Sequence, residues 1–434
     1  MFTLTGRLLW ARWPTLLGWL AATQLAKYLL IQVAGILGVY TVLGGMAVLA
    51  LAILVSLVGY VAMFRVLADD LATAEGAALP PTPRERRRAF LSGLLTAVIP
   101  YLVIYISAGQ LQADYALYAA QALYQSRQVV EAGEPVELVG IPLGPLSVSI
   151  LAAAFVGRWL YKRYQDRLAV WWAAAAAYLE VLWFFLAALI LVDLQKVITA
   201  WVEQRQGVVW LDDARGWVGE QFAWALTAWD GVLWLVAFVV GIVVLPLTWL
   251  ATAGVVMGRA YAVRKLAWAR APWARRRAVR RARGRWRALP AWLRGRSGDV
   301  KDIAVGRFAP LINAFTLMLR SGPAMIGVFV LGYVVIDGLD ETVWWAVTRQ
   351  RGPSTLADSA LFFGVVSTAV MLVFEQVRVA YLAAATDSVR AVLEAREARE
   401  AEASGPSGKG EAQAGDVVAA RVARGEADVE DGVR

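Results

Sequence analysis

Four ionisable residues lie inside long apolar stretches of the sequence, where charged side chains could bind a solute, relay protons or join helices. Two are bases, Lys27 and Arg320, and two are acids, Glu180 and Glu375. A charge at membrane depth costs roughly 2.5–3.5 kcal/mol on insertion scales, so such groups usually face protein or water and pair with one another. These four residues are therefore predicted to form a buried charge network.

Three interpretations of this network stay open. An ion-pair clasp would hold four helices together, whereas a site for a solute or for protons would use the same charges in transport. In the third interpretation, Arg320 reaches the membrane interface by snorkelling, which is also the default expected for Arg378 near a cytoplasmic helix end. At about 1.5 Å per residue, the four charges fall at a similar depth, and this favours contact among them.

Most enzyme chemistries lack their usual residues in this chain. The sequence contains no Cys and no His, which removes thiol nucleophiles, Cys/His zinc sites, haem ligation by these residues and a His general base. Phosphate-loop, GxSxG, HExxH and calcium-loop patterns do not occur either. We predict no cofactor and no metal, and an enzyme that used only Glu, Asp and Arg ranks third among the function classes.

The elements that must position these charges are membrane-spanning helices. The 434 residues are 59% hydrophobic with a mean hydropathy of +0.55, and the excess gathers in stretches of about 20 residues, the length that spans a bilayer core. The sequence predicts an all-α, polytopic membrane helix bundle with about eight spans. These are residues 14–38, 40–64, 91–110, 146–163, 169–192, 231–257, 310–336 and 359–383.

The orientation follows from a basic stretch at residues 258–309. It holds sixteen Lys or Arg against two acids, and such loops stay on the cytoplasmic side during insertion. Alternating the spans from there places the N and C termini in the cytoplasm and residues 111–145, 193–230 and 337–358 outside. We predict a multi-pass protein of the cell (plasma or inner) membrane.

Four regions are predicted along the chain. Residues 1–257 form a membrane region with about six spans, and residues 258–309 form the basic, Arg/Trp-rich cytoplasmic loop. Residues 310–403 hold the last two spans and a cytoplasmic helical extension. Residues 404–434 carry many charges and few large apolar side chains, so this tail is predicted to be disordered.

Two surface elements are expected beside the bundle. In the basic loop Trp interleaves with Arg, which suits anionic lipid headgroups; nucleic acid is disfavoured because both ends of the loop are tethered at the membrane. Outside, Trp210, Trp217 and Trp224 recur every seven residues and would share one face of an amphipathic helix. The residues predicted to contact lipid headgroups are Trp273, Arg275, Arg276, Arg277, Arg280, Arg281 and Trp286.

Two function classes compete. The first is a permease-like protein that handles a small molecule or lipid through a bundle with buried charges. The second is a non-catalytic membrane scaffold or assembly factor that recruits partners through its basic loop and charged tail. The expected partners are membrane lipids, with a protein partner or a second copy of the chain as a further option. A continuous polar path through the bundle would favour the first class.

Overall fold

The computed structural model describes residues 1–74, 82–129, 145–164, 172–206, 210, 216, 222–257, 320–352 and 355–403, and every named element within these ranges is an α-helix. Two compact units divide the chain, Met1–Thr386 and Asp387–Arg434. Of the second unit, the described part is the end of the last helix. The helices are α1 (Phe2–Tyr40), α2 (Val42–Ala74), α3 (Pro83–Ser107), α4 (Gln110–Val129), α5 (Pro145–Tyr164), α6 (Trp172–Glu203), α8 (Ala223–Val256), α11 (Pro323–Arg349) and α12 (Leu356–Ala403).

Seven of the described helices are long and apolar enough to cross a membrane, whereas the sequence predicted eight spans. The difference lies at the predicted span 146–163, which corresponds to α5. The apolar part of α5, Ser149–Tyr161, rises only about 20 Å as a helix, against a hydrocarbon core of about 30 Å. The structure therefore supports a polytopic helical bundle with seven candidate spans in its described part.

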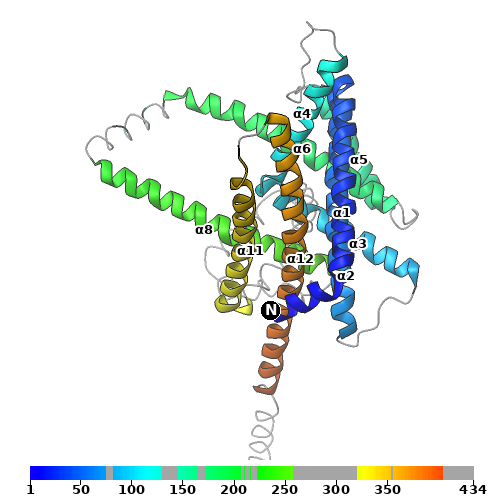
Figure 1. Ribbon diagram of the computed structural model, residues 1–434, viewed down its shortest axis with the longest axis vertical. Coiled ribbons are helices and arrows are strands. Elements are labelled where there is room, and N and C mark those ends of the chain that lie inside the picture. The colour runs from blue at the N-terminus through cyan, green and yellow to red at the C-terminus, as the bar shows by residue number, and fades with distance from the viewer. Residues whose placement is uncertain are drawn as a thin grey trace, which may run out of the picture. The chain divides into compact units, whose positions relative to one another are not determined.

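Helices α1 and α2 form a hairpin and lie side by side along most of their length (Figure 1). The chain reverses at Thr41, whose extended backbone separates the two helices and whose N–H donates to the carbonyl of Leu37 at 2.8 Å. At the open end of the hairpin, Arg12 binds both carboxylate oxygens of Asp70, at 2.6 and 2.7 Å. This pair is exposed, so it adds little stability.

Gly45 marks a close approach of the α1 and α2 backbones. A Cβ atom at this position would lie 2.8 Å from the carbonyl oxygen of Ala34 in α1 and 2.6 Å from the Tyr118 hydroxyl. A backbone atom of a packed helix cannot yield as a flexible side chain can. A residue without a side chain is therefore required here, as in other closely packed membrane helices.

Substituting Gly45 by alanine is expected to destabilise the protein by roughly 1–3 kcal/mol, because the added methyl group forces α1 and α2 apart. The measurement is thermal unfolding of the purified protein in detergent. Gly18→Ala is the matched control, since a Cβ there meets nothing within 4 Å and alanine has the higher helix propensity. Equal unfolding temperatures for the two variants would contradict the tight α1–α2 contact.

Helix α3 begins with a capped first turn at Pro83 and leads directly into α4. The Thr82 hydroxyl accepts the Glu85 N–H at 3.2 Å, and Pro83 occupies the first turn, where its missing N–H is not needed. The chain turns at Gly109, whose φ of 73° favours glycine, and α4 starts at the next residue. The two helices therefore continue one another with a bend.

Helix α4 packs against α1, and it overlaps residues 111–145, which were predicted as a segment on the outer side of the membrane. Tyr118 is fully buried against Gly38 and Gly45, whereas Tyr124 is exposed. Asp114, Arg127 and the amide side chains of this segment lower its hydropathy below that of a lipid-facing span. A helix that packs on protein tolerates such residues.

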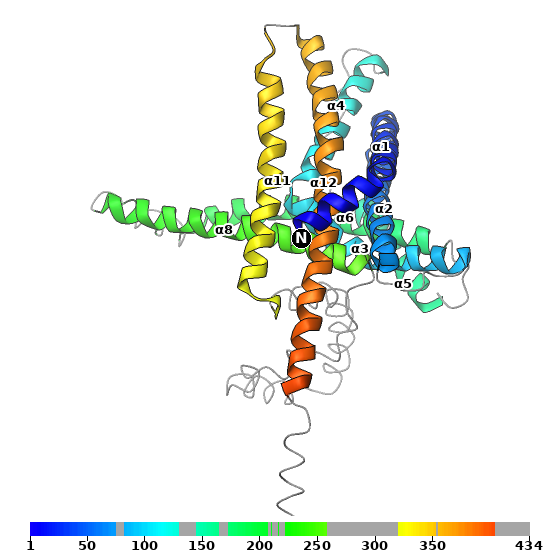
Figure 2. The same cartoon turned by 60° about the horizontal axis from the view of Figure 1, so that its bottom comes forward.

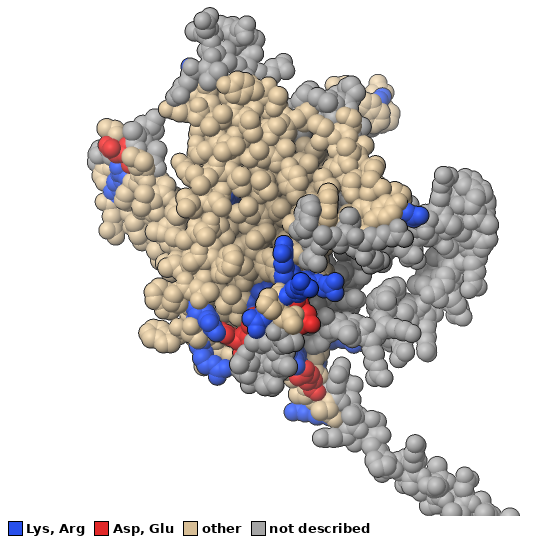
Figure 3. Space-filling view, turned by 90° about the vertical axis from the view of Figure 1, so that its right-hand side faces the viewer, with Lys and Arg blue, Asp and Glu red and all other residues tan. Residues whose placement is uncertain are grey.

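The described parts of α6 and α8 are each buried at one end and exposed at the other. In α8, Leu247, Trp249 and Leu250 are buried, whereas Trp234 and Phe238 are exposed. In Figure 3, uncharged residues cover most of the visible described face, and Lys and Arg side chains gather toward its lower end. Trp224 lies in α8 itself and Trp210 is exposed, while Trp217 falls outside the described residues, so the predicted outer helix is not tested.

Helices α11 and α12 form a second hairpin, and they lie alongside each other in two views (Figures 1 and 2). The Tyr381 hydroxyl of α12 donates to the carbonyls of Val328 and Phe329 in α11, at 3.2 and 3.0 Å. Residues 337–349, predicted as the start of an outer loop, instead continue α11. This correction moves Asp337 and Asp340 from a loop into the interior of a helix.

Candidate functional site

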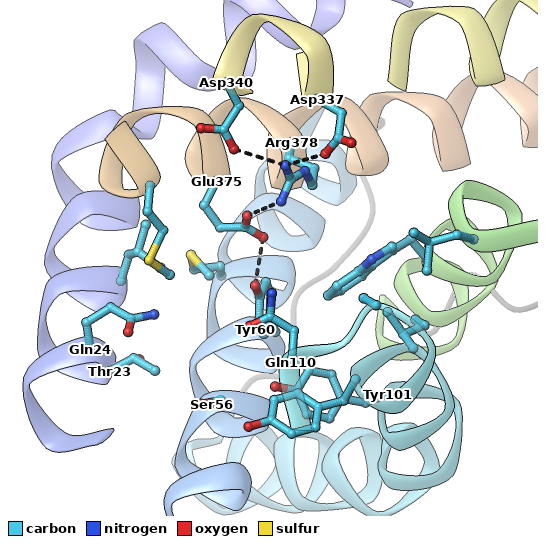
Figure 4. A pocket seen from close by; sticks show the side chains of 18 of the residues that line it. Thr23, Gln24, Ser56, Tyr60, Tyr101, Gln110, Asp337, Asp340, Glu375 and Arg378 are labelled. Atoms are coloured by element: carbon cyan, nitrogen blue, oxygen red, sulfur yellow. Dashed lines mark hydrogen bonds and ion pairs between the residues drawn. The ribbon is translucent and has the colours of Figure 1, made fainter. Parts of the chain in front are cut away.

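A polar cavity of about 420 Å³ lies between α1, α2, α3, α8, α11 and α12 (Figure 4). Ring-bearing side chains line much of it, namely Tyr60, Tyr101, Tyr105, Trp249 and Tyr333. Among the described lining residues, the charged ones are Lys27, Asp337, Asp340, Glu341, Glu375 and Arg378. All of these residues belong to the unit Met1–Thr386, so the cavity is a feature of one compact body.

Arg378 is the centre of the charge cluster on the α11–α12 side of the cavity. Its Nη1 lies 2.5 Å from Glu375 Oε2, and its Nη2 lies 2.9 Å from Asp337 Oδ1 and 3.5 Å from Asp340 Oδ2. The acid on α12 is three residues before Arg378, and the two acids on α11 are also three apart, so each helix presents its charges on one face. Figure 4 shows the guanidinium between these carboxylates.

The same cluster reaches α2 through Tyr60. The Tyr60 hydroxyl donates to Glu375 Oε1 at 2.7 Å, while Oε2 of the same carboxylate binds Arg378. The Glu375 side chain is 5% exposed and that of Arg378 15%. The guanidinium of Arg378, which was expected to snorkel, binds three carboxylates, and one of them, Asp337, is 58% exposed.

A second ion pair lies at the α1–α4 side of the cavity. Lys27 Nζ is 2.7 Å from Asp114 Oδ2, with side chains 13% and 4% exposed. The Tyr105 hydroxyl donates to the same carboxylate oxygen, and Lys27 lies 5.8 Å from the centre of the Tyr105 ring. Lys27 lines the cavity, whereas Asp114, its ion-pair partner, is not among the lining residues.

Aromatic rings connect the two charge clusters. Tyr60 lies 5.1 Å from Trp249 and 5.7 Å from Tyr101, measured between ring centres, and Tyr101 lies 5.6 Å from Tyr105. Tyr60 and Tyr105 each hold an acid through their hydroxyl groups. The cavity thus combines fixed carboxylates with aromatic faces, a combination that can bind a charged organic molecule.

Two of the four predicted network residues, Lys27 and Glu375, line this cavity. Glu180 is buried on α6, and Arg320 is exposed just before α11; neither is among the residues that line it. Sequence reasoning did not select Asp114, Asp337 and Asp340 for the site, because all three were assigned to outer segments. The spacing of Asp337 and Asp340, three residues apart in a stretch that continues an apolar helix, was the available signal.

A second pocket, of about 350 Å³, adjoins the first. It lies between α11 and α12 and shares Asp340, Glu341 and Met371 with the polar cavity, while Trp344, Ser367 and Val370 complete its wall. We call this pocket the vestibule. The two pockets therefore share one wall, formed by Asp340, Glu341 and Met371.

The cavity lies well inside α2 and α12, and it also reaches the junction of α3 and α4 at Ala108 and Gln110. Tyr60 is about 27 Å from the start of α2 at Val42 and about 16 Å from Leu71, at about 1.5 Å per residue. On α12, Glu375 is about 28 Å from Leu356 by the same measure. Charges at such positions are costly unless they pair, which explains why both bases of the cavity lie against carboxylates.

No protein-family model matches the chain, and no curated protein and no solved structure matches it significantly. The class therefore follows from the chain itself, whose described ranges hold seven long apolar helices, as a polytopic helical membrane protein does. Within the described ranges, no group of three or more His, Cys, Asp or Glu side chains is arranged to hold a metal ion. The predicted headgroup contacts, Trp273 to Trp286, and the tail 404–434 lie outside the described residues.

Proposed function

We propose that the protein is a permease of the cell (plasma or inner) membrane that moves a small molecule through the polar cavity. The observation that carries this proposal is the cavity itself, which brings paired charges and aromatic rings together between six helices. The proposal includes eight spans with both termini cytoplasmic, and it therefore assigns a crossing to the short helix α5.

An ion-pair clasp would explain the buried charges but not the space between them. Protein interiors are packed at the density of organic crystals, and a void of this size loses contacts that side chains could have made. The cavity volume of about 420 Å³ falls within the range of small-molecule sites, roughly 300–1,000 Å³. A binding role accounts for both the charges and the space.

The second candidate is a membrane scaffold or assembly factor. Its support is the basic stretch 258–309 and the charged tail 404–434, which suit anionic lipid headgroups, a protein partner or a second copy of the chain. A scaffold requires no site that opens to both sides of the membrane. Access to the polar cavity therefore distinguishes the two functions.

A cysteine placed at Gln24 on the cavity wall is expected to react with a membrane-impermeant thiol reagent from either side of a vesicle. A permease must expose its site alternately to both sides, and the native chain contains no cysteine that would interfere. The measurement is labelling of full-length Gln24→Cys protein in vesicles of right-side-out and inside-out orientation.

Three single-cysteine variants calibrate this experiment. Arg88→Cys and Thr355→Cys are exposed and are expected to react only from the cytoplasmic and only from the outer side, respectively, whereas Ala177→Cys is buried on α6 and is expected to react from neither. Labelling of Gln24→Cys from one side only, or from neither, would favour the scaffold over the permease. Labelling of Arg88→Cys from outside would reverse the proposed topology.

A further inference from the structure

The charges around the polar cavity do not balance. Of the described residues that line the cavity, four are acids and two are bases. Both bases are already engaged, because Lys27 binds Asp114 and Arg378 binds Glu375, Asp337 and Asp340. With every group ionised, an anion entering this site would meet an excess of negative charge, whereas a cation would reduce it.

The rings beside these acids add a second, independent preference. Tyr60 and Trp249 lie 5.1 Å apart at an interplanar angle of 52°, and Tyr101 lies within 6.4 Å of Trp249. The faces of such rings carry negative potential and attract cations within about 6 Å, most strongly when water is excluded. An organic cation with apolar groups around its charge can also bury those groups against the rings, which a small inorganic ion cannot do.

The vestibule repeats the same chemistry on the route to the cavity. Asp340 and Glu341 lie on α11, and Trp344 follows one helical turn later. The opposite wall is formed by Ser367, Val370 and Met371 of α12. An acid pair next to an indole ring favours a cation with apolar substituents, and the vestibule shares both acids with the inner cavity.

We propose that the polar cavity binds a monovalent organic cation of the ammonium class. It enters between α11 and α12 past Asp340, Glu341 and Trp344, and its charged group rests against Tyr60 and Trp249 beside the carboxylate of Glu375. That this cation is the transported solute rests on the permease function; the binding itself does not. The same ammonium group occurs in free solutes and in choline-bearing lipid headgroups.

Choline and tetraethylammonium are the probes, measured by calorimetric titration against the full-length protein in a maltoside detergent. The neutral isostere of choline, 3,3-dimethylbutan-1-ol, has the same shape without the charge. We expect saturable binding of both cations and at least tenfold weaker binding of the isostere. Glycerophosphocholine distinguishes the two sources of the ammonium group. If it competes with choline, the ligand is a lipid headgroup; if it does not compete, the ligand is a free solute.

Variants of one ring locate the bound cation. Trp249→Leu is expected to weaken choline binding at least tenfold, while Trp249→Phe retains part of the affinity because it keeps an aromatic face. Trp183→Leu is the matched control, since Trp183 lies outside both pockets. If Trp249→Leu does not fold, the double variant Asp340→Asn, Glu341→Gln provides the test, because it removes two acids of the vestibule and should also weaken binding.

Three results would overturn the inference: no saturable binding of either cation at millimolar concentration, equal affinity for choline and its neutral isostere, or choline binding that neither set of variants weakens. Failure of the permease proposal gives a different result. Cation binding together with one-sided labelling of Gln24→Cys would support the cation site and contradict the proposed transport. Two-sided labelling without cation binding would support the permease proposal and contradict the proposal that the ligand is an ammonium cation.

Discussion

Replacing Arg378 with methionine is expected to lower the free energy of unfolding by roughly 3–5 kcal/mol, the usual effect of removing one partner from a buried ion pair. Glu375, Asp337 and Asp340 would then lose their shared base. The carboxylate of Glu375 is most affected, because its side chain is 5% exposed and Tyr60 becomes its remaining partner in the described cluster. The measurement is chemical or thermal unfolding of the purified protein in detergent.

Two further variants control this experiment. Arg378→Lys keeps the charge but loses the planar fork that reaches α11 and α12 together, so it should recover only part of the stability. Arg12→Met removes the Arg12–Asp70 pair, whose arginine side chain is 47% exposed, and is expected to change stability by less than about 1 kcal/mol. Similar losses for Arg378→Met and Arg12→Met would show that the Arg378 cluster is hydrated and open.

The second large effect is expected at the Lys27–Asp114 pair. Lys27→Met and Asp114→Asn should each destabilise the protein by roughly 3–5 kcal/mol, because each leaves a buried charge without its counterion. The double variant should recover part of this loss, since it leaves no unmatched charge. A double-mutant cycle on unfolding free energies measures the coupling, and additive losses would contradict the contact between α1 and α4.

The double variant also separates a structural clasp from a functional site. A clasp holds the helices, so a folded neutral pair should keep the choline binding of the parent protein. A functional Lys27 sets the charge balance of the cavity, so the folded double variant should bind choline with altered affinity. Binding is compared only after the unfolding measurement has shown that the variant is folded.

The α-helical membrane class was predictable because it depends on local properties. Stretches of about twenty apolar residues must form helices in lipid, where every backbone N–H and C=O requires an internal partner. The same argument located the cores of α1, α2, α3, α6, α8 and α12. It failed at residues 337–349, because acidic side chains resemble those of a loop when their helical neighbours are not known.

The sequence by itself determined which charges would be costly in the membrane and therefore needed partners; Lys27 and Glu375 were selected on this ground alone. Only the tertiary structure decided which residues those partners are. Asp114 is 87 residues from Lys27 and Asp337 is 41 residues from Arg378, as their positions in the chain show. Pairing over such separations depends on how helices pack, on bends such as that at Gly109 and on close contacts such as that at Gly45, and hydropathy carries no information about any of these.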